Sequence, residues 1–329
     1  MTAAAVPSRN ALAPLTYQVA ALGAPCRRNK DERQICTEVD AWAARLGSTE
    51  HARFGELASR AFPETERSSV VLFGQWLAWL FAFDDQRDDG PAGRDVHATD
   101  QLYEKVLGGA DEPVAVAFHD LWQATRPRTT PGWQTAFRGH MDEHRAACRA
   151  EARFRLAGRP PSPGEYATIR RRANGPFMFD LAEPILGVRL PDGLRMTQTW
   201  QTMLTACNDV TAWCNDIASV EKERAHGDVL NYVIVLAHHH RTEGNAAVEC
   251  VLDKIAERID DLLDAARRLP KEFDDAGMTR KQARDASKIA VALLGAPRGH
   301  LEWLLETDRY ETDPAIRSAS SLSATPSSR

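Results

Sequence analysis

VVLFGQWLAWLFAFDDQRD, residues 70–88, decides the fold, because an apolar run leads directly into a cluster of carboxylates. Residues 70–83 are apolar except for Gly74 and Gln75. A membrane span needs about 20 apolar residues, so this run is too short to span and is typical of a helix buried in a protein core. We therefore expect a core helix whose last turn carries acidic side chains.

The carboxylates at the end of this run need a counter-charge. Asp84 and Asp88 lie one helical turn apart and face the same way, with Asp85 beside them. Like charges at this spacing repel, and carboxylates beside an apolar wall carry a desolvation cost that nothing in the neighbouring sequence offsets. A bound cation would offset both costs. The alternative is a helix end in solvent, where the acids are simply hydrated.

A second polar cluster lies in CNDIASVEKERAHGD, residues 214–228. Steps of four place Asn215, Ser219 and Glu223 within roughly an 80° arc of one helix face. Their amide, hydroxyl and carboxylate oxygens are the ligand types of a hard cation such as Mg²⁺. Taken alone, such a triplet also fits a solvated helix face. The two clusters together favour a metal site.

The two motifs resemble those of the bacterial class I terpene synthases, or terpene cyclases. In that family DDxxD and NDxxSxxKE face each other across a helical barrel. Here they read DDQRD from Asp84 and NDIASVEKE from Asn215, without a gap or substitution. The resemblance implies an all-α, single-domain barrel around a central active-site cavity. It also implies that three Mg²⁺ ions and the diphosphate of a prenyl substrate are held by Asp84, Asp85, Asp88, Asn215, Ser219 and Glu223.

The segment YATIRRRANG, residues 166–175, resembles the diphosphate-sensing stretch on the kinked helix of that family. The resemblance aligns Arg171 with the sensor, Asn174 with the linker and Gly175 with the effector carbonyl. Three consecutive arginines, 170–172, leave the register open by one residue. A solvated helix surface is the alternative for these arginines, although guanidinium groups bind phosphate oxygens bidentately.

The segment GHLEWLLETDRY, residues 299–310, resembles the closing motif of the same family. The resemblance makes Arg309 and Tyr310 hydrogen-bond donors to diphosphate. Lys222, beside the metal triplet, adds a further positive charge. These groups would stabilise the leaving diphosphate together with the metal ions.

Ionisation of an allylic diphosphate makes a carbocation that water would quench, so the pocket below the metals should be apolar and aromatic. Aromatic ring faces stabilise cations. Leu80 and Phe81 lie one turn before Asp84, and Trp303 lies two turns before Tyr310. We expect the substrate cavity to be lined by Leu80, Phe81, Phe177, Asn208, Thr211 and Trp303. Core or cap roles stay open for Phe177, Asn208 and Thr211, and we assign Trp76, Trp79 and Trp213 to the core.

Two other functions compete with this interpretation. Residues 260–264, DDLLD, form a second DDxxD, and isoprenyl diphosphate synthases, which elongate chains, carry two. Here the second motif lies in a charge-rich segment whose acids and bases interleave as on a solvated face, and elongation leaves the Asn215 triplet unexplained. A non-catalytic helical scaffold or prenyl-binding protein would be expected if ligands were missing. The DxDD motif of class II cyclases is absent from the sequence.

The chain of 329 residues is expected to form one folded domain. Ligands from Asp84 to Tyr310 must converge on one site, and apolar residues recur at helical spacings of three and four. We predict a disordered N-terminus at 1–12, the cyclase domain at 13–312 and a disordered Ser-rich tail at 313–329. Loops are predicted near residues 126, 158, 190 and 268.

Composition limits the partners. The net charge is −5, from 41 basic and 46 acidic side chains without long basic runs, so nucleic acid is not an expected partner. Stable membrane insertion is not expected either. Six scattered cysteines without a CxxC pair, and an N-terminus without a secretion signal, favour a cytoplasmic enzyme. Dimerisation, which is frequent in the family, stays open.

The substrate of first choice is farnesyl diphosphate, because sesquiterpene cyclases are common in the family, followed by geranylgeranyl and then geranyl diphosphate. The sequence predicts a cyclic hydrocarbon or alcohol as product. It does not predict the carbon skeleton, because side-chain contours inside the cavity decide how the cation folds.

Overall fold

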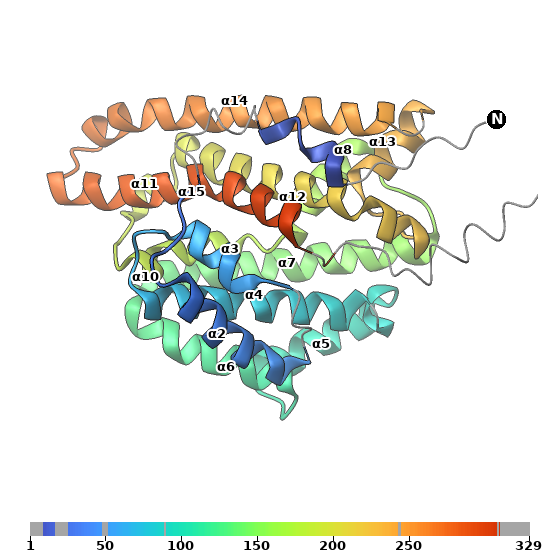
Figure 1. The fold of residues 1–329 in the computed structure, drawn as a ribbon, viewed down its shortest axis with the longest axis horizontal. Helices are drawn as coiled ribbons and strands as arrows, with labels where there is room; N and C mark the ends of the chain where they lie inside the picture. The colour runs from blue at the N-terminus through green and yellow to red at the C-terminus, as the bar shows by residue number, and fades with distance from the viewer. Residues whose placement is uncertain are drawn as a thin grey trace, which may run out of the picture.

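The structure is a computed structural model that describes residues 9–16, 26–47, 52–88, 90–242, 245–307 and 309. Within these ranges the chain forms α-helices and short 3-10 helices (η) joined by turns, without a β-strand (Figure 1). The predicted all-α fold is confirmed. In chain order the elements are η1 Arg9–Leu12, α2 Glu32–Ala43, η2 Ala44–Leu46, α3 Phe54–Ala61, α4 Arg67–Asp88, η3 Pro91–Gly93, α5 Val96–Gly108, α6 Pro113–Thr125, η4 Arg126–Arg128, α7 Pro131–Ala157, α8 Pro163–Ala173, α9 Phe177–Asp180, α10 Ala182–Leu186, α11 Asp192–Arg195, α12 Gln198–Ala225, α13 Tyr232–His240, α14 Asn245–Asp275 and α15 Arg280–Glu306.

The helices stack in layers, and the two motif-bearing helices lie in different layers. Figure 1 shows α14 along one side of the molecule, α12 and α15 beneath it, then α4 and α7, with α5 and α6 on the opposite side. Helix α12 packs against α8, α13, α14 and α15, whereas α4 packs against α2, α3, α6 and α10. The Asp-rich motif at the end of α4 and the Asn/Ser/Glu triplet of α12 therefore belong to two walls.

Helix α4 is the predicted core helix. It is apolar around most of its circumference, as expected for a helix with neighbours on several sides. Trp76 and Trp79 are fully buried, and their indole N–H groups donate to Thr125 Oγ1 at 3.0 Å and to the Val114 carbonyl at 2.9 Å. Their expected place in the core is confirmed. These bonds and the surrounding rings fix α4, and with it the direction of the acids in its last turn.

Helix α8 is followed by a break in the helix, where the backbone approaches α4. Helix α8 begins with a capping box between Ser162 and Glu165, which satisfies backbone donors at its first turn. It ends before Gly175, which has a φ of +70° and is followed by a proline. A Cβ on Gly175 would lie 3.0 Å from Leu80 Cδ2, so both the left-handed backbone and the close approach favour glycine. This is the predicted kink.

Two boundaries differ from the sequence-based expectations. The predicted loop near residue 268 is wrong, because α14 continues through Pro270 to Asp275. Leu269 and Phe273, which flank the proline, are buried and hold this segment on the core. At the other end, Arg9–Leu12 form η1 and Leu12 is fully buried, whereas residues 1–12 were expected to be disordered. The tail 313–329 lies outside the described residues.

Within the described ranges, no helix combines the length and the apolar character that crossing a membrane would require.

Candidate active site

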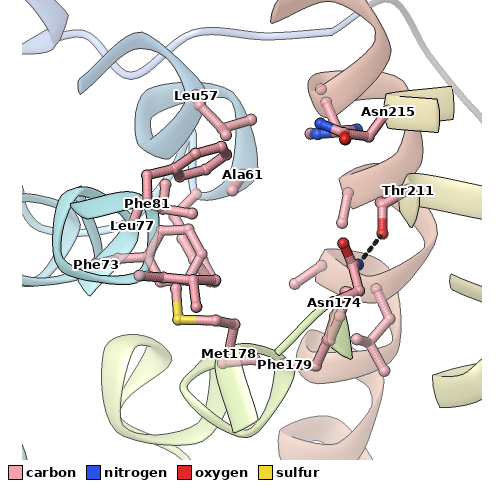
Figure 2. Close-up of a pocket in the computed structure, with 18 of the residues that line it drawn as sticks. Leu57, Ala61, Phe73, Leu77, Phe81, Asn174, Met178, Phe179, Thr211 and Asn215 are labelled. Carbon is pink, nitrogen blue, oxygen red and sulfur yellow. Dashed lines mark hydrogen bonds between the residues drawn. The ribbon is translucent and has the colours of Figure 1, made fainter. Parts of the chain in front are cut away.

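An apolar cavity of about 170 Å³ lies between α4 and α12. Figure 2 shows Phe73, Leu77 and Phe81 of α4 on one side and Thr211 and Asn215 of α12 on the other. Helices α3, α8, α9, α10 and α15 complete the enclosure. The lining residues are Leu57, Ala61, Phe62, Phe73, Leu77, Leu80, Phe81, Asp84, Arg170, Ala173, Asn174, Met178, Phe179, Ala182, Thr211, Asn215, Ala292, Leu293, Ala296, Gly299 and His300.

A polar chamber of about 230 Å³ adjoins this cavity. Phe81, Asp84, Arg170, Ala173 and Asn215 line both spaces, so they mark the boundary between them. The structure brings together in this chamber all predicted metal ligands and two of the predicted diphosphate-binding side chains: Asp84, Asp85, Asp88, Asn215, Ser219, Glu223, Lys222 and Arg309. A charged compartment therefore opens directly onto an apolar one.

The α4 wall of the polar chamber carries a carboxylate without a full set of partners. Asp84 Oδ1 is buried and has no hydrogen-bond partner in the described part of the chain. Burial raises the pKa of Asp84 to about 7, although the Arg87 guanidinium, 3.7 Å away, opposes this shift. Burial also disfavours the charge on Asp88, but contacts of 2.9 Å with Arg87 and 2.8 Å with Arg155 outweigh it, so the pKa of Asp88 falls to about 2.

The α12 wall presents oxygens on successive turns. Asn215 Oδ1 accepts a hydrogen bond from Arg170 Nη2 at 3.1 Å, and Ser219 Oγ donates to the Asn215 carbonyl at 2.9 Å. Glu223 Oε2 accepts from Asn231 Nδ2 at 2.7 Å. Burial, and then the neighbouring Asp216, raise the pKa of Glu223 to about 8. The steps of four thus place the three side chains as the sequence predicted.

These residues fit a hard divalent cation. Every donor atom is an oxygen, and burial raises the pKa of both Asp84 and Glu223 because the arginines nearby do not supply enough positive charge to offset it. A cation between the walls would supply that charge. Nowhere in the described ranges do three or more His, Cys, Asp or Glu side chains form a metal-binding group by themselves.

The three consecutive arginines separate into different environments. Arg170 lines both chambers, and its Nε donates to the buried Asp216 at 2.7 Å. Arg171, the predicted sensor, lines neither chamber and instead forms a two-point contact with the buried Asp209 at 2.8 and 2.6 Å. Arg172 is half exposed. Of the three, Arg170 is the one that faces the candidate site, one residue before the aligned position.

Hydrogen bonds from amide side chains connect the helix break after α8 to α12. Asn174 Nδ2 donates to Asn208 Oδ1 at 2.7 Å and to Thr211 Oγ1 at 3.2 Å, the second of which Figure 2 shows as a dashed line. Asn208 Nδ2 donates to the Arg171 carbonyl at 2.7 Å. Asn208 does not line the cavity but braces the break, whereas Asn174 and Thr211 do line it. The Gly175 carbonyl accepts from the Met178 amide at 2.9 Å.

The predicted cavity lining is found in part. Leu80, Phe81 and Thr211 line the cavity, but Phe177 and Trp303 lie behind its walls. Phe177 is fully buried against Trp79, Phe137 and His144. The indole of Trp303 donates to the Ala52 carbonyl at 2.9 Å and its ring lies 5.8 Å from that of Phe81. Neither aromatic faces the cavity: Trp303 supports the lining residue Phe81, whereas Phe177 packs in the core.

Sequence reasoning missed several lining residues. Phe73, Leu77 and Phe81 follow each other at four-residue steps, a signal that could have been extended from Phe81. The α15 wall had no comparable signal, because it consists largely of small residues. Those lining residues are Ala292, Leu293, Ala296, Gly299 and His300.

Arg309 closes the boundary from the C-terminal side. Its Nη2 donates to Asp85 Oδ1 at 2.6 Å, and its guanidinium lies 4.6 Å from the centre of the Phe81 ring. The preceding helix end is anchored by a 2.5 Å contact between Arg60 and Glu306. Arg309 thus contacts both a predicted metal ligand, Asp85, and the aromatic wall at Phe81. Tyr310 lies outside the described residues.

The second DDxxD stands apart from this site. Asp260, Asp261 and Asp264 are exposed on α14 and line neither chamber. Asp261 and Asp264 pair with Arg258 and Arg267 of the same helix. These contacts are those of a solvated helix face, as the interleaved charges predicted.

Comparisons with known proteins agree with this geometry. Residues 75–261 match the family model described as terpene synthase family 2, C-terminal metal binding. The (-)-delta-cadinene synthase of Streptomyces clavuligerus is 32% identical over 285 residues, which cover 84% of this chain and 86% of that protein. The (+)-T-muurolol synthase ((2E,6E)-farnesyl diphosphate cyclizing) of Roseiflexus castenholzii is 31% identical over 67% of this chain and 72% of its own length.

The fold agrees as well. The solved structure of a cucumene synthase variant aligns with a TM-score of 0.79 and 25% identity, covering 88% of this chain and 99% of that one. The resemblance inferred from the two motifs is thereby confirmed. The chain belongs to terpene synthase family 2 and is a class I terpene cyclase of the bacterial type.

Proposed function

We propose that this protein cyclises farnesyl diphosphate to a terpene in a Mg²⁺-dependent reaction and releases diphosphate. The observation that carries the proposal is the junction of a polar chamber, lined by both motifs, with an apolar cavity. A prenyl diphosphate has the same two parts, a charged head and an apolar tail. The similar (+)-T-muurolol synthase, whose name specifies farnesyl diphosphate, supports this chain length over the geranylgeranyl and geranyl alternatives.

In this proposal the polar chamber binds the head of the substrate. Asp84, Asp88 and Asn215, Ser219, Glu223 hold three Mg²⁺ ions from the two walls, with Asp85 in support. When bound, these ions supply the charge that stabilises diphosphate as a leaving group. Arg170, Lys222 and Arg309 donate hydrogen bonds to diphosphate oxygens, with Tyr310 assigned to the same task from the sequence.

The apolar cavity binds and shapes the tail. Phe73, Leu77 and Phe81 exclude water from the reacting carbons, which protects the carbocation from early quenching. The face of the Phe81 ring, which already meets the Arg309 cation, is suited to stabilise positive charge by about 0.5–2 kcal/mol. The helix break at Asn174 and Gly175 holds this side of the cavity against α12.

Arg170→Lys is expected to lower kcat/KM for farnesyl diphosphate by about 10–100-fold. A lysine keeps the charge but cannot bridge Asp216, Asn215 and the diphosphate with one planar group. The matched control is Arg172→Lys, which changes a neighbouring half-exposed arginine outside both chambers and should cost less than about threefold. Diphosphate release, measured at several substrate concentrations, gives both values. A larger loss in the Arg172 variant would contradict the assignment of Arg170.

The substrate is tested by comparing kcat/KM for geranyl, farnesyl and geranylgeranyl diphosphate. We expect farnesyl diphosphate to have the highest value. A higher value for geranylgeranyl diphosphate would overturn the proposed chain length but keep the reaction class.

A further inference from the structure

His300 introduces a polar side chain into an otherwise apolar wall. Helix α15 faces the cavity with Ala292, Leu293, Ala296, Gly299 and His300, which recur at helical spacing. The alanines leave space in front of this wall, whereas a Cβ on Gly299 would lie 3.1 Å from Arg60 Cβ, so the glycine allows the close approach of α3. The imidazole of His300 is therefore the large polar group that α15 presents to a substrate tail.

One nitrogen of the imidazole lacks a polar partner. Its Nδ1 is buried and has no hydrogen-bond partner in the described ranges of the chain. Such an orphaned buried atom is uncommon, because native proteins pair the large majority of their buried polar side-chain atoms. The ring is held instead by Trp303 on the next turn, with ring centres 5.6 Å apart and planes inclined by 30°.

The surroundings keep this imidazole neutral. Burial, and then the positive charge of Arg170, lower the pKa of His300 to about 3, so the ring carries a free lone pair at neutral pH. The charged side chains that also line the cavity are Asp84 and Arg170, both at the boundary with the polar chamber. The other polar lining groups, Asn174, Thr211 and Asn215, are amides and a hydroxyl, which are not bases at neutral pH.

We propose that His300 is a catalytic residue that removes the proton ending the carbocation cascade, which makes the main product a hydrocarbon. This inference rests on the proposed cyclase function. A C–H bond next to the cationic carbon breaks, and its electron pair forms the new C=C bond. The proton passes to the lone pair of the imidazole, and the imidazolium later gives it to water when the site opens.

This transfer is downhill even to a weak base. A C–H bond beside a cationic carbon is far more acidic than an imidazolium, so a low proton affinity does not prevent the step. The low affinity has a benefit, since a neutral ring does not repel the cation that it faces. Bound diphosphate would also offset the charge of Arg170, which reduces the cost of forming the imidazolium.

The test is chemical rescue of His300→Ala. We expect the hydrocarbon yield of this variant to fall at least tenfold more than its diphosphate release, because a positioned general base contributes about 10²–10⁴-fold. Added imidazole, which fits the space left by the side chain, should restore hydrocarbon formation at least about threefold. Products are analysed by gas chromatography and mass spectrometry, and diphosphate release is measured in the same incubations, with excess Mg²⁺.

Leu293→Ala is the matched control, because it enlarges the same wall without removing a nitrogen. Its product mixture should not respond to imidazole. His300→Gln provides a second variant that keeps most of the side-chain volume if the alanine variant does not fold. Loss of hydrocarbon relative to diphosphate release in a folded His300 variant supports the proposal, and rescue of a folded His300→Ala by imidazole supports it further.

Three results overturn the proposal: an unchanged hydrocarbon fraction in both His300 variants, equal rescue of Leu293→Ala, or an alcohol as the main wild-type product. Failure of the cyclase function is a separate result, since the wild-type protein would then release no diphosphate from any prenyl diphosphate.

Discussion

Glu223→Ala is expected to lower kcat/KM by at least about 100-fold, while the helical circular dichroism spectrum stays unchanged. The loss follows from the position of Glu223 at the end of the α12 triplet, of which it is the charged member. The fold should persist because Asn231, which donates to Glu223, also donates to the Asp216 carbonyl at 2.6 Å.

The matched control for this change is Glu257→Ala. Glu257 is an exposed acid on α14 that pairs with Lys254 at 2.9 Å on the surface, so its removal should change turnover by less than twofold, with about 0–1 kcal/mol of stability at stake. Both variants are compared by diphosphate release under the same Mg²⁺ concentration. If the turnover of Glu223→Ala stays within tenfold of the wild type, the assignment of Glu223 as a metal ligand is wrong.

Asp84→Asn is expected to affect activity and stability in opposite directions. Turnover should fall by about 10²–10³-fold, because the buried Asp84 Oδ1 loses its charge at the boundary of both chambers. The metal-free protein should become more stable at pH 8 by about 1–3 kcal/mol, since asparagine carries no charge that burial penalises. Urea unfolding in the presence of a chelator measures the second effect.

The pH dependence of this gain follows from the raised pKa. Asp84 has a folded-state pKa of about 7, above the ordinary value of 3.8. Between these two values the folded wild-type protein binds a proton that the unfolded chain has released, so its stability falls as pH rises from about 4 to about 7. The advantage of the asparagine variant should therefore be absent below about pH 4, grow through this window and stay constant above it.

Asp264→Asn is the control for this second change. It neutralises one acid of the exposed DDLLD segment, which lines neither chamber, and should alter neither turnover nor the pH dependence of stability. If Asp84→Asn does not change stability between pH 4 and pH 8, the description of Asp84 as a buried carboxylate lacking a counter-charge is wrong.

The sequence was informative where function depends on local spacing. The predicted ligands Asn215, Ser219 and Glu223 share one face whatever surrounds α12, and the apolar run before Asp84 requires burial on any fold. The placement of both motifs on their helices could therefore be predicted without coordinates. The kink at Gly175 was also accessible, because a glycine followed by a proline rarely continues a helix.

Other parts depend on packing that no local pattern encodes. Consecutive residues on a helix point about 100° apart, so the orientation of α8 against α12 decides that Arg170, and not Arg171, faces the polar chamber. Trp303 was expected in the cavity, but its ring packs 5.8 Å from that of Phe81, and of the two only Phe81 lines the cavity. His300 became a candidate only when the small residues of α15 proved to face the same cavity.

The most direct test of this account is product formation from farnesyl diphosphate with and without Mg²⁺, analysed by gas chromatography and mass spectrometry. We expect a cyclic sesquiterpene hydrocarbon that requires Mg²⁺, with equimolar diphosphate released and no longer prenyl diphosphates when isopentenyl diphosphate is added. Elongated diphosphates, or no turnover of any prenyl diphosphate in the presence of Mg²⁺, would contradict the central claim that the two facing motifs ionise a substrate for cyclisation.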